Sequence, residues 1–327
     1  MMHPRLCAAI ATVLLGLPVA DAVAQSALTA VQTVNTMNKL WGRHPGMRAN
    51  HAKGIVAEGS FTPSAAAAGL SKAAIFAGAP VPVTVRFSDS TGLPALPDGS
   101  SPANPHGMSI KFHINSNEVD VVTNSLPFFP VATGEDFLAL LEALSVSGPD
   151  APKPTKAEEF IAAHPTVGKA LGAIHTPTSF ARETYNGVDA FIFVNAAGDR
   201  QPFRFRIVPA AGTEHLSPEE AAEQPPDFLV DELPQRLAKG PVVFHLLAQL
   251  ANPGDQTKDP TQPWPEDRKV VDMGTITLSH AVADNAKAQA ELRYLPNRLE
   301  PGIEVSDDPL IDARVRAYVI SFGRRAQ

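Results

Sequence analysis

The sequence predicts an α+β protein built on an antiparallel β-barrel with flanking helices. Two observations carry this prediction. Seven or eight segments have the alternation of apolar and polar residues that is typical of strands, and some neighbours are joined by short turns. Segments with helical spacing are inserted between two groups of these strands, which favours a barrel with helices packed on its outside.

The predicted strands form two groups. The first group comprises 81–88, 107–114 and 117–124, and the second comprises 189–210, 240–251 and 269–280. Asn115 and Ser116 alone separate two strands of the first group, and a two-residue link is typical of a β-hairpin. In the second group the turn sequence AAGD divides 189–210 into two alternating runs. Both groups therefore contain strands that pair with their neighbours in sequence.

Helical spacing of apolar residues marks the remaining regular segments. The predicted helices cover 28–42, 134–148, 155–164, 167–174, 217–240 and 309–322. Ser217 with Glu220 three residues later is a capping box, and Pro218 occupies the favoured first helical position. The last helix has Asp308 as its cap and Gly323 as its stop signal.

Residues 1–24 are predicted to be a cleavable signal peptide. A short head with His3 and Arg5 precedes an apolar run that ends in the sequence AVA at 22–24. No later apolar run has the length of a membrane span. We therefore expect an exported, periplasmic protein with a single domain over residues 25–327.

Composition narrows the class of protein further. Loss of Arg5 and Asp21 with the signal leaves the net charge at −7, which gives nucleic acid no reason to bind. The only cysteine, Cys7, lies in the predicted signal, so we expect no disulfide in the mature chain. With 44% apolar residues, the fold must be held by its core.

The C-terminal helix carries a candidate site. Arg314 and Tyr318 are four residues apart and share a face, and Arg325 returns to nearly the same direction if the helix continues, whereas Arg316 points elsewhere. A guanidinium beside a phenol favours the anionic phenolate, which is a ligand for ferric iron and for heme iron. On spacing alone, the alternative is a tyrosine packed inward with arginines in solvent.

Three further stretches, taken with this one, resemble the heme catalase superfamily. MRANHAKGIVAEGSF at 47–61 contains the RxxHAKG pattern of the distal-histidine segment, and VTVRFSDSTG at 83–92 contains the VRFS strand. NPHGMSIKFH at 104–113 is similar to the RDPRGFAxKF strand, with NPHG in place of DPRG. PNRLEPGIEVSDDPLIDARVRAY at 296–318 is similar to the PGIExSPDxxLQxRLFxY segment of the proximal tyrosine.

These matches follow the family's order from about residue 37 to the C-terminus. The resemblance implies the catalase-like antiparallel β-barrel with flanking helices, in a small, exported protein that is similar to catalase-related peroxidases. It also implies that the C-terminal helical domain of full-length catalases, and the nucleotide site that often accompanies it, are lacking.

The resemblance assigns roles to nine residues. It implies that Tyr318 is the heme-iron ligand and that Arg314 keeps this tyrosine ionised. It implies that His51 is the catalytic acid and base, with Asn124 orienting the peroxide. The other implied heme contacts are Arg48, Arg86 and Arg325 at the propionates, Ser88 behind the histidine, and Phe129 on the heme face.

The implied function is that of a heme-dependent peroxidase. Such an enzyme reduces organic peroxides, hydrogen peroxide or both through a high-valent heme intermediate, with ferric heme b as cofactor and a small organic electron donor as second substrate. The alternatives are a true catalase that dismutates hydrogen peroxide, a heme hydroperoxide isomerase, and a non-enzymatic ligand-binding barrel. A homo-oligomer is left open.

Overall fold

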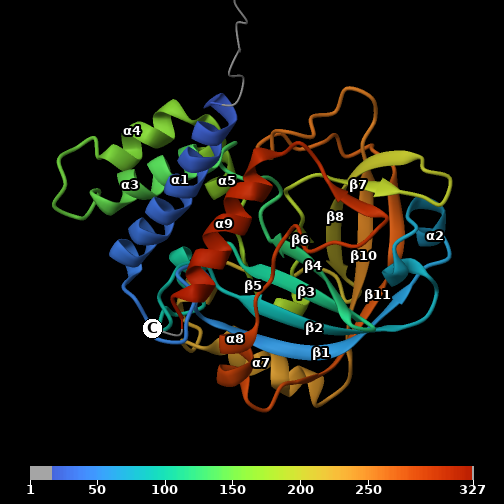
Figure 1. The fold of residues 1–327 in the computed structure, drawn as a ribbon. Helices are drawn as coiled ribbons and strands as arrows, with labels where there is room; N and C mark the ends of the chain where they lie inside the picture. Colours follow the sequence, from blue (N-terminus) through green and yellow to red (C-terminus); the bar gives the residue numbers. More distant parts are fainter. Residues whose placement is uncertain (1–16, 326–327) are drawn as a thin grey trace, which may run out of the picture.

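Antiparallel strands form a barrel with helices on its outside in the computed structural model, which describes residues 17–325 (Figure 1). Most of the predicted signal peptide lies outside these residues. The strands are β1 (Gly54–Pro63), β2 (Val81–Ser88), β3 (Gly107–Ile114), β4 (Asn117–Asn124), β5 (Thr176–Pro177), β6 (Tyr185–Asn186), β7 (Phe191–Val194), β8 (Arg200–Pro209), β9 (His215–Leu216), β10 (Val242–Leu250), β11 (Val270–Ala281) and β12 (Ile303–Val305).

Eight of the described strands close into a barrel, in the order β10, β11, β1, β2, β3, β4, β6 and β8. The barrel closes because β8 also pairs with β10. Strands β7 and β12 extend the sheet from β8, and β5 and β9 form a separate pair. All of these pairings are antiparallel, so the predicted antiparallel barrel is confirmed.

The helices lie outside the barrel (Figure 1). The α-helices are α1 (Leu17–Trp41), α2 (Ala67–Leu70), α3 (Gly134–Ser145), α4 (Lys156–Ala163), α5 (Pro165–Gly172), α6 (Pro218–Ala222), α7 (Phe228–Leu237), α8 (Asn285–Glu291) and α9 (Pro309–Gly323), and the short 3₁₀ helices are η1 (Ala74–Phe76), η2 (Ser101–Ala103) and η3 (Phe180–Arg182). Asp308 caps α9 by accepting a hydrogen bond from the Leu310 amide at 2.9 Å, as predicted.

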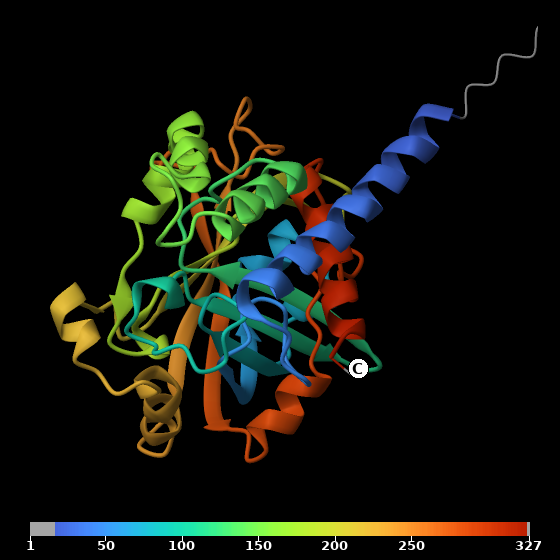
Figure 2. The same ribbon diagram turned by 90° about the vertical axis from the view of Figure 1, so that its left-hand side faces the viewer.

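Helices α1, α3 and α9 pack against one another and form a layer on one side of the barrel (Figures 1 and 2). Their contact is apolar: Val34 and Met37 of α1 and Leu141 of α3 are buried together, with Ala317 of α9 packed against them. Burial of such apolar faces is the main force that holds a helix to its neighbours. The layer therefore has its own small core, separate from that of the barrel.

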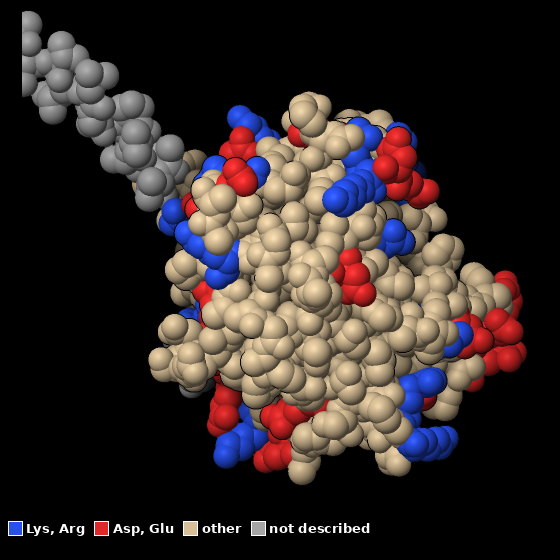
Figure 3. Space-filling model, turned by 90° about the vertical axis from the view of Figure 1, so that its right-hand side faces the viewer, with Lys and Arg blue, Asp and Glu red and all other residues tan. Residues whose placement is uncertain are grey.

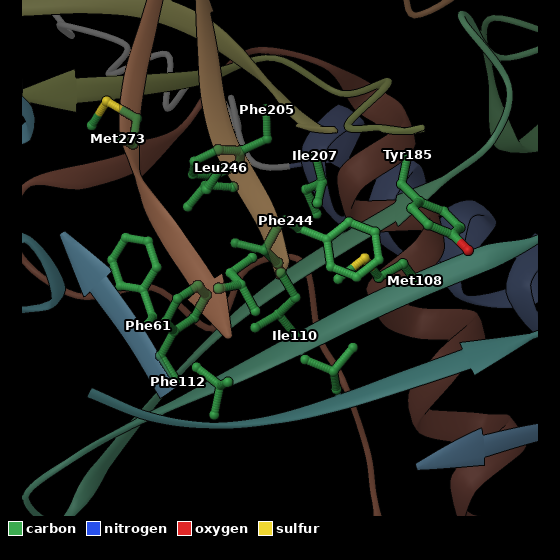
Figure 4. Packing of buried hydrophobic residues seen from close by; sticks show 14 of the residues in the cluster. Phe61, Met108, Ile110, Phe112, Tyr185, Phe205, Ile207, Phe244, Leu246 and Met273 are labelled. Carbon is green, nitrogen blue, oxygen red and sulfur yellow. The ribbon is translucent and has the colours of Figure 1, made fainter. Parts of the chain in front are cut away.

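The barrel interior is filled by apolar side chains (Figure 4). Phe61, Phe112 and Phe244 are fully buried, and Phe61 meets Phe112 edge to face with ring centroids 5.2 Å apart. Side chains of successive strand residues point to opposite faces, so the residues that fill the barrel alternate with residues on its outer face. The interior is a packed core, and the outer face is left to build a site.

Several predicted boundaries were wrong. The N-terminal helix begins at Leu17 rather than at residue 28, and it runs without a break past the predicted cleavage point after Ala24. The segment 217–240 contains two helices, because Pro225 and Pro226 lie between α6 and α7 and two successive prolines favour a break, although a single proline, Pro234, lies inside α7. Strand β1 was not predicted as a strand.

The surface seen in Figure 3 has lysines and arginines interspersed with acidic residues near its edges and few charges in its middle. That face therefore presents no extended patch of one sign. Within residues 17–325, no helix has both the length and the apolar content that crossing a bilayer requires.

Candidate active site

A cavity of about 390 Å³ lies between the outer face of the barrel and the layer of α1, α3 and α9. This volume is in the range of small-molecule and cofactor pockets. All nine residues singled out in the sequence border it, namely Arg48, His51, Arg86, Ser88, Asn124, Phe129, Arg314, Tyr318 and Arg325. Residues that are up to 277 positions apart in the chain are thus brought to one place.

Strand alternation explains why the barrel supplies polar residues to this cavity. Val85 and Phe87 of β2 are fully buried inside the barrel. Arg86 and Ser88 must then point outward, because neighbouring residues of a strand face opposite sides. The predicted VRFS strand therefore contributes its two polar residues to the site and its two apolar residues to the core.

The register of three strands aligns a second set of residues. Ser88 of β2 lies opposite Gly107 of β3, and Gly107 lies opposite Asn124 of β4. A Cβ atom on Gly107 would lie 2.8 Å from the Ser88 Oγ and 3.4 Å from the His51 ring. Glycine is therefore required at this position so that the serine and the histidine can lie against the sheet.

His51 lies just before β1 and has a left-handed backbone, with φ of 56°. Its Nδ1 is 2.7 Å from the Asp89 carbonyl oxygen and 3.2 Å from the Ser88 Oγ. Because a carbonyl oxygen only accepts hydrogen bonds, Nδ1 carries the proton and Nε2 is left as an acceptor. The predicted Ser88 contact is present, but the carbonyl of Asp89 is the closer partner.

The surroundings of His51 keep its imidazole neutral. Burial is the largest cause, followed by the positive charge of Arg86, and together they lower its pKa to about 4. The hydrogen bond to Asp89 opposes this effect without reversing it. A neutral imidazole with a free Nε2 can accept a proton at any pH well above 4.

A buried pair that the sequence analysis missed lies behind His51. The Asp89 carboxylate accepts a hydrogen bond from the His106 Nδ1 at 3.1 Å, and both side chains are essentially inaccessible to solvent. Asp89 thus holds the backbone carbonyl that orients His51, while its own side chain is anchored by His106. The signal in the sequence was the histidine of NPHG, which replaces an arginine of the resembling motif.

Three arginines meet at one end of the cavity. Arg48 donates to the carbonyl oxygens of Gln289 and Leu292 at 3.1 and 2.8 Å, and Arg325 donates to Leu292 at 2.8 Å. The Arg86 Nε donates to the Gln289 side chain at 2.9 Å. In the described part of the chain, no carboxylate lies within ion-pairing distance of these three guanidiniums. Gln289, which the sequence analysis did not single out, is their shared support.

This arginine cluster carries uncompensated positive charge. Burial lowers the pKa of Arg48 to about 10 and that of Arg325 to about 9, and the charge of Arg48 adds to the effect on Arg325. The pKa of Arg86 is lowered further by burial and by Arg48. The Arg325 Nε is buried without a hydrogen-bond partner. An anionic ligand in the cavity would relieve this repulsion and satisfy that atom.

Tyr318 projects from α9, and Arg314 lies one turn before it. The Arg314 Nε donates to the Tyr318 oxygen at 3.2 Å, as the spacing predicted. The guanidinium also forms an ion pair with buried Asp189, which precedes β7. Burial lowers the pKa of Arg314, but Asp189 and the Tyr318 oxygen outweigh burial and raise the pKa above its ordinary value. Arg314 is therefore a fixed cation beside the phenol.

Asn124 and Phe129, the last two residues predicted from the sequence, also line the cavity. The Asn124 Oδ1 accepts a hydrogen bond from the Leu126 amide at 2.8 Å, which leaves the Nδ2 of Asn124 as its available donor. Phe129 packs against Phe137 of α3 with ring centroids 5.6 Å apart. Val34 and Met37 of α1 line the same cavity, so part of its wall is apolar.

The fold is an antiparallel barrel with one cavity that is bordered by the Tyr318 oxygen, the His51 imidazole and the three arginines. These groups define the class as a barrel protein with a site suited to a redox cofactor. The chain matches the catalase family over residues 20–325. It belongs to the catalase family.

Relatives of known name agree with this assignment. The chain is 34% identical to the catalase-related peroxidase of Mycolicibacterium paratuberculosis over 90% of its own length and 94% of the relative's. It is 32% identical to the catalase-related peroxidase of Synechococcus elongatus, over 93% and 91% of the two chains. The catalase of Pseudomonas syringae is 29% identical over 83% of this chain, which spans 56% of that catalase.

Solved structures support the same fold. A bacterial catalase superposes with a TM-score of 0.77 at 20% identity, over 99% of this chain and 67% of its own. A fungal catalase superposes with a TM-score of 0.74 at 22% identity, over 99% and 66% of the two chains. This chain therefore corresponds to the barrel part of those longer proteins.

Family membership implies a heme cofactor, and the residues present fit one. The Tyr318 oxygen is a suitable iron ligand, and the arginine cluster offers three guanidiniums without acidic partners to the heme carboxylates. The apolar wall suits a flat macrocycle. The unpartnered Arg325 Nε is the clearest observation in favour, because a buried donor of this kind requires an acceptor.

Proposed function

We propose that the chain is a heme peroxidase that reduces organic peroxides and hydrogen peroxide, with heme b as cofactor. The observation that carries the proposal is that a single cavity is bordered both by Tyr318, hydrogen-bonded to Arg314, and by a neutral His51. Two relatives of similar length, each over 30% identical, are named catalase-related peroxidases. When bound, heme supplies the iron through which the peroxide is reduced.

The protein's own residues bind the cofactor and set its electronic state. The Tyr318 oxygen would be the iron ligand, and the Nε–H of Arg314 donates a hydrogen bond to it. Arg48, Arg86 and Arg325 bind the two heme carboxylates by charge-assisted hydrogen bonds. Phe129 packs on the face of the macrocycle.

His51 moves the proton. Its Nε2 would accept the proton of the peroxide O–H and return it to the oxygen that leaves as water or alcohol. Over the whole turnover one peroxide, two protons and two electrons give one alcohol and one water, or two waters from hydrogen peroxide, and the donor would supply these electrons by way of the bound heme. The Asp89 carbonyl and the Ser88 hydroxyl hold the ring in the tautomer that this step requires. The Asn124 Nδ2 donates to the peroxide and orients it.

The walls of the cavity favour organic peroxides. Val34 and Met37 of α1 and Phe137, Leu140 and Leu141 of α3 are apolar and border the same cavity as His51. An alkyl group on the peroxide would be removed from water by contact with these side chains. Hydrogen peroxide makes no such contact.

The test measures binding and turnover separately. Heme-loaded protein is expected to have a Soret band and to oxidise a phenolic dye with tert-butyl hydroperoxide, and His51→Gln should slow this oxidation by about 10² to 10⁴-fold while retaining heme. A purified protein that binds no heme would indicate a non-enzymatic barrel. Conversion of a lipid hydroperoxide to a rearranged product without dye oxidation would indicate an isomerase.

A true catalase is the second candidate, because catalases at 26% to 30% identity align over more than four fifths of this chain. Oxygen release from hydrogen peroxide distinguishes the two functions. Rapid oxygen release with no dye oxidation would support the catalase and contradict the peroxidase.

We also propose that the protein is exported to the periplasm after removal of residues 1–24. Ser26 is the first residue of α1, among those with described side chains, that borders the cavity. Cleavage after Ala24 would therefore leave the described α1 wall intact. N-terminal sequencing of protein from a periplasmic fraction tests this, and an intact Met1 there would contradict it.

A further inference from the structure

We propose that a second cavity, which shares Arg293 with the heme cavity, binds the electron donor, and that this donor is a small phenol that carries a carboxylate. This inference rests on the proposed peroxidase function and names its second substrate. The second cavity has a volume of about 340 Å³ and is open to solvent. The size suits one aromatic ring with a short side chain.

The two cavities lie on the same face of the barrel. Arg86 and Ser88 of β2 border the heme cavity, and Thr84, two residues earlier on the same face, borders the second one. Likewise Ser109 of β3 borders the first cavity and Lys111 the second. The cavities are therefore neighbours along the strands, because residues two apart in a strand point the same way.

A single segment, residues 289–294, separates the cavities. On the heme side, the carbonyl oxygens of Gln289 and Leu292 accept hydrogen bonds from Arg48, and Leu292 also accepts one from Arg325. The side chains of Leu292 and Arg293 border the second cavity. A donor bound there would thus lie one chain segment away from the arginines that hold the heme carboxylates.

Arg293 is the recognition group for a carboxylate. It borders both cavities, and its guanidinium lies 5.0 Å from the ring centroid of Phe322. In the described part of the chain, no carboxylate lies within ion-pairing distance of Arg293. A half-buried guanidinium held on an aromatic ring, with its charge unpaired, is a site for an anionic group on a planar ligand.

The other cations of the cavity are already paired. Lys111 binds Glu118 and Asp120, each at 2.7 Å, and Arg298 binds Glu118 at 2.6 Å. These groups are structural and do not compete with Arg293 for a ligand. Phe322 supplies the aromatic surface, and its ring also contacts Arg325 at 4.9 Å from the centroid.

A phenol can supply both the electrons and the protons that the reduction of peroxide consumes. In the balanced reaction, one peroxide and two phenols give one alcohol, one water and two phenoxyl radicals. Each phenol O–H bond yields one hydrogen atom equivalent, and the two together reduce the O–O bond of the peroxide. The peroxide is the oxidant, and the phenols are the only reductant needed.

The first experiment measures binding without turnover. Ferulate, a phenol with a carboxylate, is titrated calorimetrically into ferric heme-loaded protein in the absence of peroxide, and guaiacol, which has the same ring without the carboxylate, is the matched ligand. We expect ferulate to bind, and we expect Arg293→Gln to lower its affinity by about tenfold, the usual effect of a lost charge-assisted hydrogen bond. The affinity for guaiacol should be the same in the variant and in the wild-type protein.

A second variant and a control make the test independent of any folding effect of Arg293→Gln. Ala288→Trp fills the cavity from α8 without removing an arginine, and it should also weaken the binding of ferulate. Arg206→Gln removes an exposed arginine of β8 that does not border either cavity and should have no effect. In steady-state assays, Arg293→Gln should raise the KM for ferulate more than it raises the KM for guaiacol.

Unchanged ferulate binding in both Arg293→Gln and Ala288→Trp would overturn the donor site. An equal loss of affinity for ferulate and for guaiacol in Arg293→Gln would overturn the role of the carboxylate. Failure of the wild-type protein to oxidise any donor with peroxide would instead contradict the proposed peroxidase function, because the calorimetric result does not depend on turnover.

Discussion

His51 combines a left-handed backbone, a fixed tautomer and a pKa of about 4. The neutral ring is the form that accepts a proton from peroxide, so we expect the kcat/KM for peroxide to stay constant from neutral pH down to about 5 and to fall as the pH passes through about 4. Stopped-flow measurement of the peroxide reaction across this range checks the prediction. A fall near pH 6.5 would contradict it, since that is the pKa of an unperturbed histidine.

The same pKa has a consequence for stability. In the unfolded chain His51 has a pKa near 6.5, so between about pH 6.5 and 4 the unfolded state binds a proton that the folded state does not. The free energy of unfolding should therefore decrease as the pH falls through this window. His51→Gln is expected to reduce that decrease, measured by urea unfolding at pH 7 and pH 5.

Tyr318 has a direct spectroscopic test. Tyr318→Phe removes the proposed ligand oxygen and leaves the ring, so the heme-loaded protein should have an altered Soret band and weaker heme retention. Arg316→Gln is the matched control on the same helix, because Arg316 does not border the cavity. Retained heme with an unchanged spectrum in Tyr318→Phe would refute the ligand assignment.

The close packing of Gly107 against Ser88 and His51 can be tested by substituting the glycine. An alanine Cβ would lie 2.8 Å from the Ser88 Oγ, so Gly107→Ala should displace Ser88 and His51, slow the reaction with peroxide and cost about 1–3 kcal/mol of stability. Gly148→Ala is the control, because no atom lies within 4 Å of its added Cβ. Wild-type peroxide kinetics in Gly107→Ala would contradict the positioning role of this contact.

The residues that the sequence did not reveal are those that meet their partners only through strand pairing or through contact with a distant part of the chain. His106 and Asp89 are 17 positions apart and become partners only because β2 and β3 pair. Gln289 supports the arginines from a helix with no apolar signature of its own. In contrast, His51 and Tyr318 lie in motifs whose local sequence is informative, and the structure brings both to one cavity.

At the scale of elements, three strands with one face in the barrel core, β2, β3 and β4, were predicted with their observed bounds, whereas β1 was not predicted. β2, β3 and β4 alternate because one face must be apolar, and that requirement is visible in the sequence. β6 and β12 have two and three residues, which is too short for any periodicity, and they exist only through pairing with strands far away in the chain. Closure of the barrel was therefore less predictable than its strands.

Asp120 joins β4 to Leu295, the residue that follows the segment between the two cavities, and it gives an element-scale prediction. It is buried, pairs with Lys111 at 2.7 Å and accepts a hydrogen bond from the Leu295 amide at 2.8 Å. Asp120→Ala leaves the buried Lys111 short of a partner, so we expect a loss of about 3–5 kcal/mol in the free energy of unfolding, measured in urea.

A neighbouring residue controls for this effect. Glu118 pairs with the same lysine, but its side chain is 41% exposed, so Glu118→Ala should cost less than about 1 kcal/mol. The double variant Asp120→Ala with Lys111→Met should be more stable than Asp120→Ala alone, because no buried charge is then left unpaired. Equal losses for Asp120→Ala and Glu118→Ala would contradict this account.

At the scale of the whole molecule, the barrel is a rigid support and the helix layer closes the site against it. The packed interior fixes the outward direction of Arg86 and Ser88, and α9 brings Tyr318 from the far end of the chain. Heme would contact both parts at once. Binding of heme should therefore stabilise the whole fold and not only the site.

This expectation is measurable by calorimetry of the heme-free and heme-loaded protein. At a thousandfold excess of heme over its dissociation constant, the stabilisation is about 4 kcal/mol, which corresponds to a rise of several degrees in Tm. Arg48→Leu should reduce the rise, because it removes one of the three cations proposed to bind the heme carboxylates. An unchanged Tm on heme addition would contradict the proposed contacts.

The Leu292 carbonyl oxygen accepts hydrogen bonds from Arg48 and Arg325, while its side chain borders the second cavity. A ligand that shifts this residue on one side would also disturb its contacts on the other side, and the affinities of the two cavities would then be linked. Thermodynamic reciprocity then requires that a donor which tightens heme retention is itself bound more tightly, by the same factor, when heme is present. The dividing segment would thus couple reductant uptake to the presence of the cofactor.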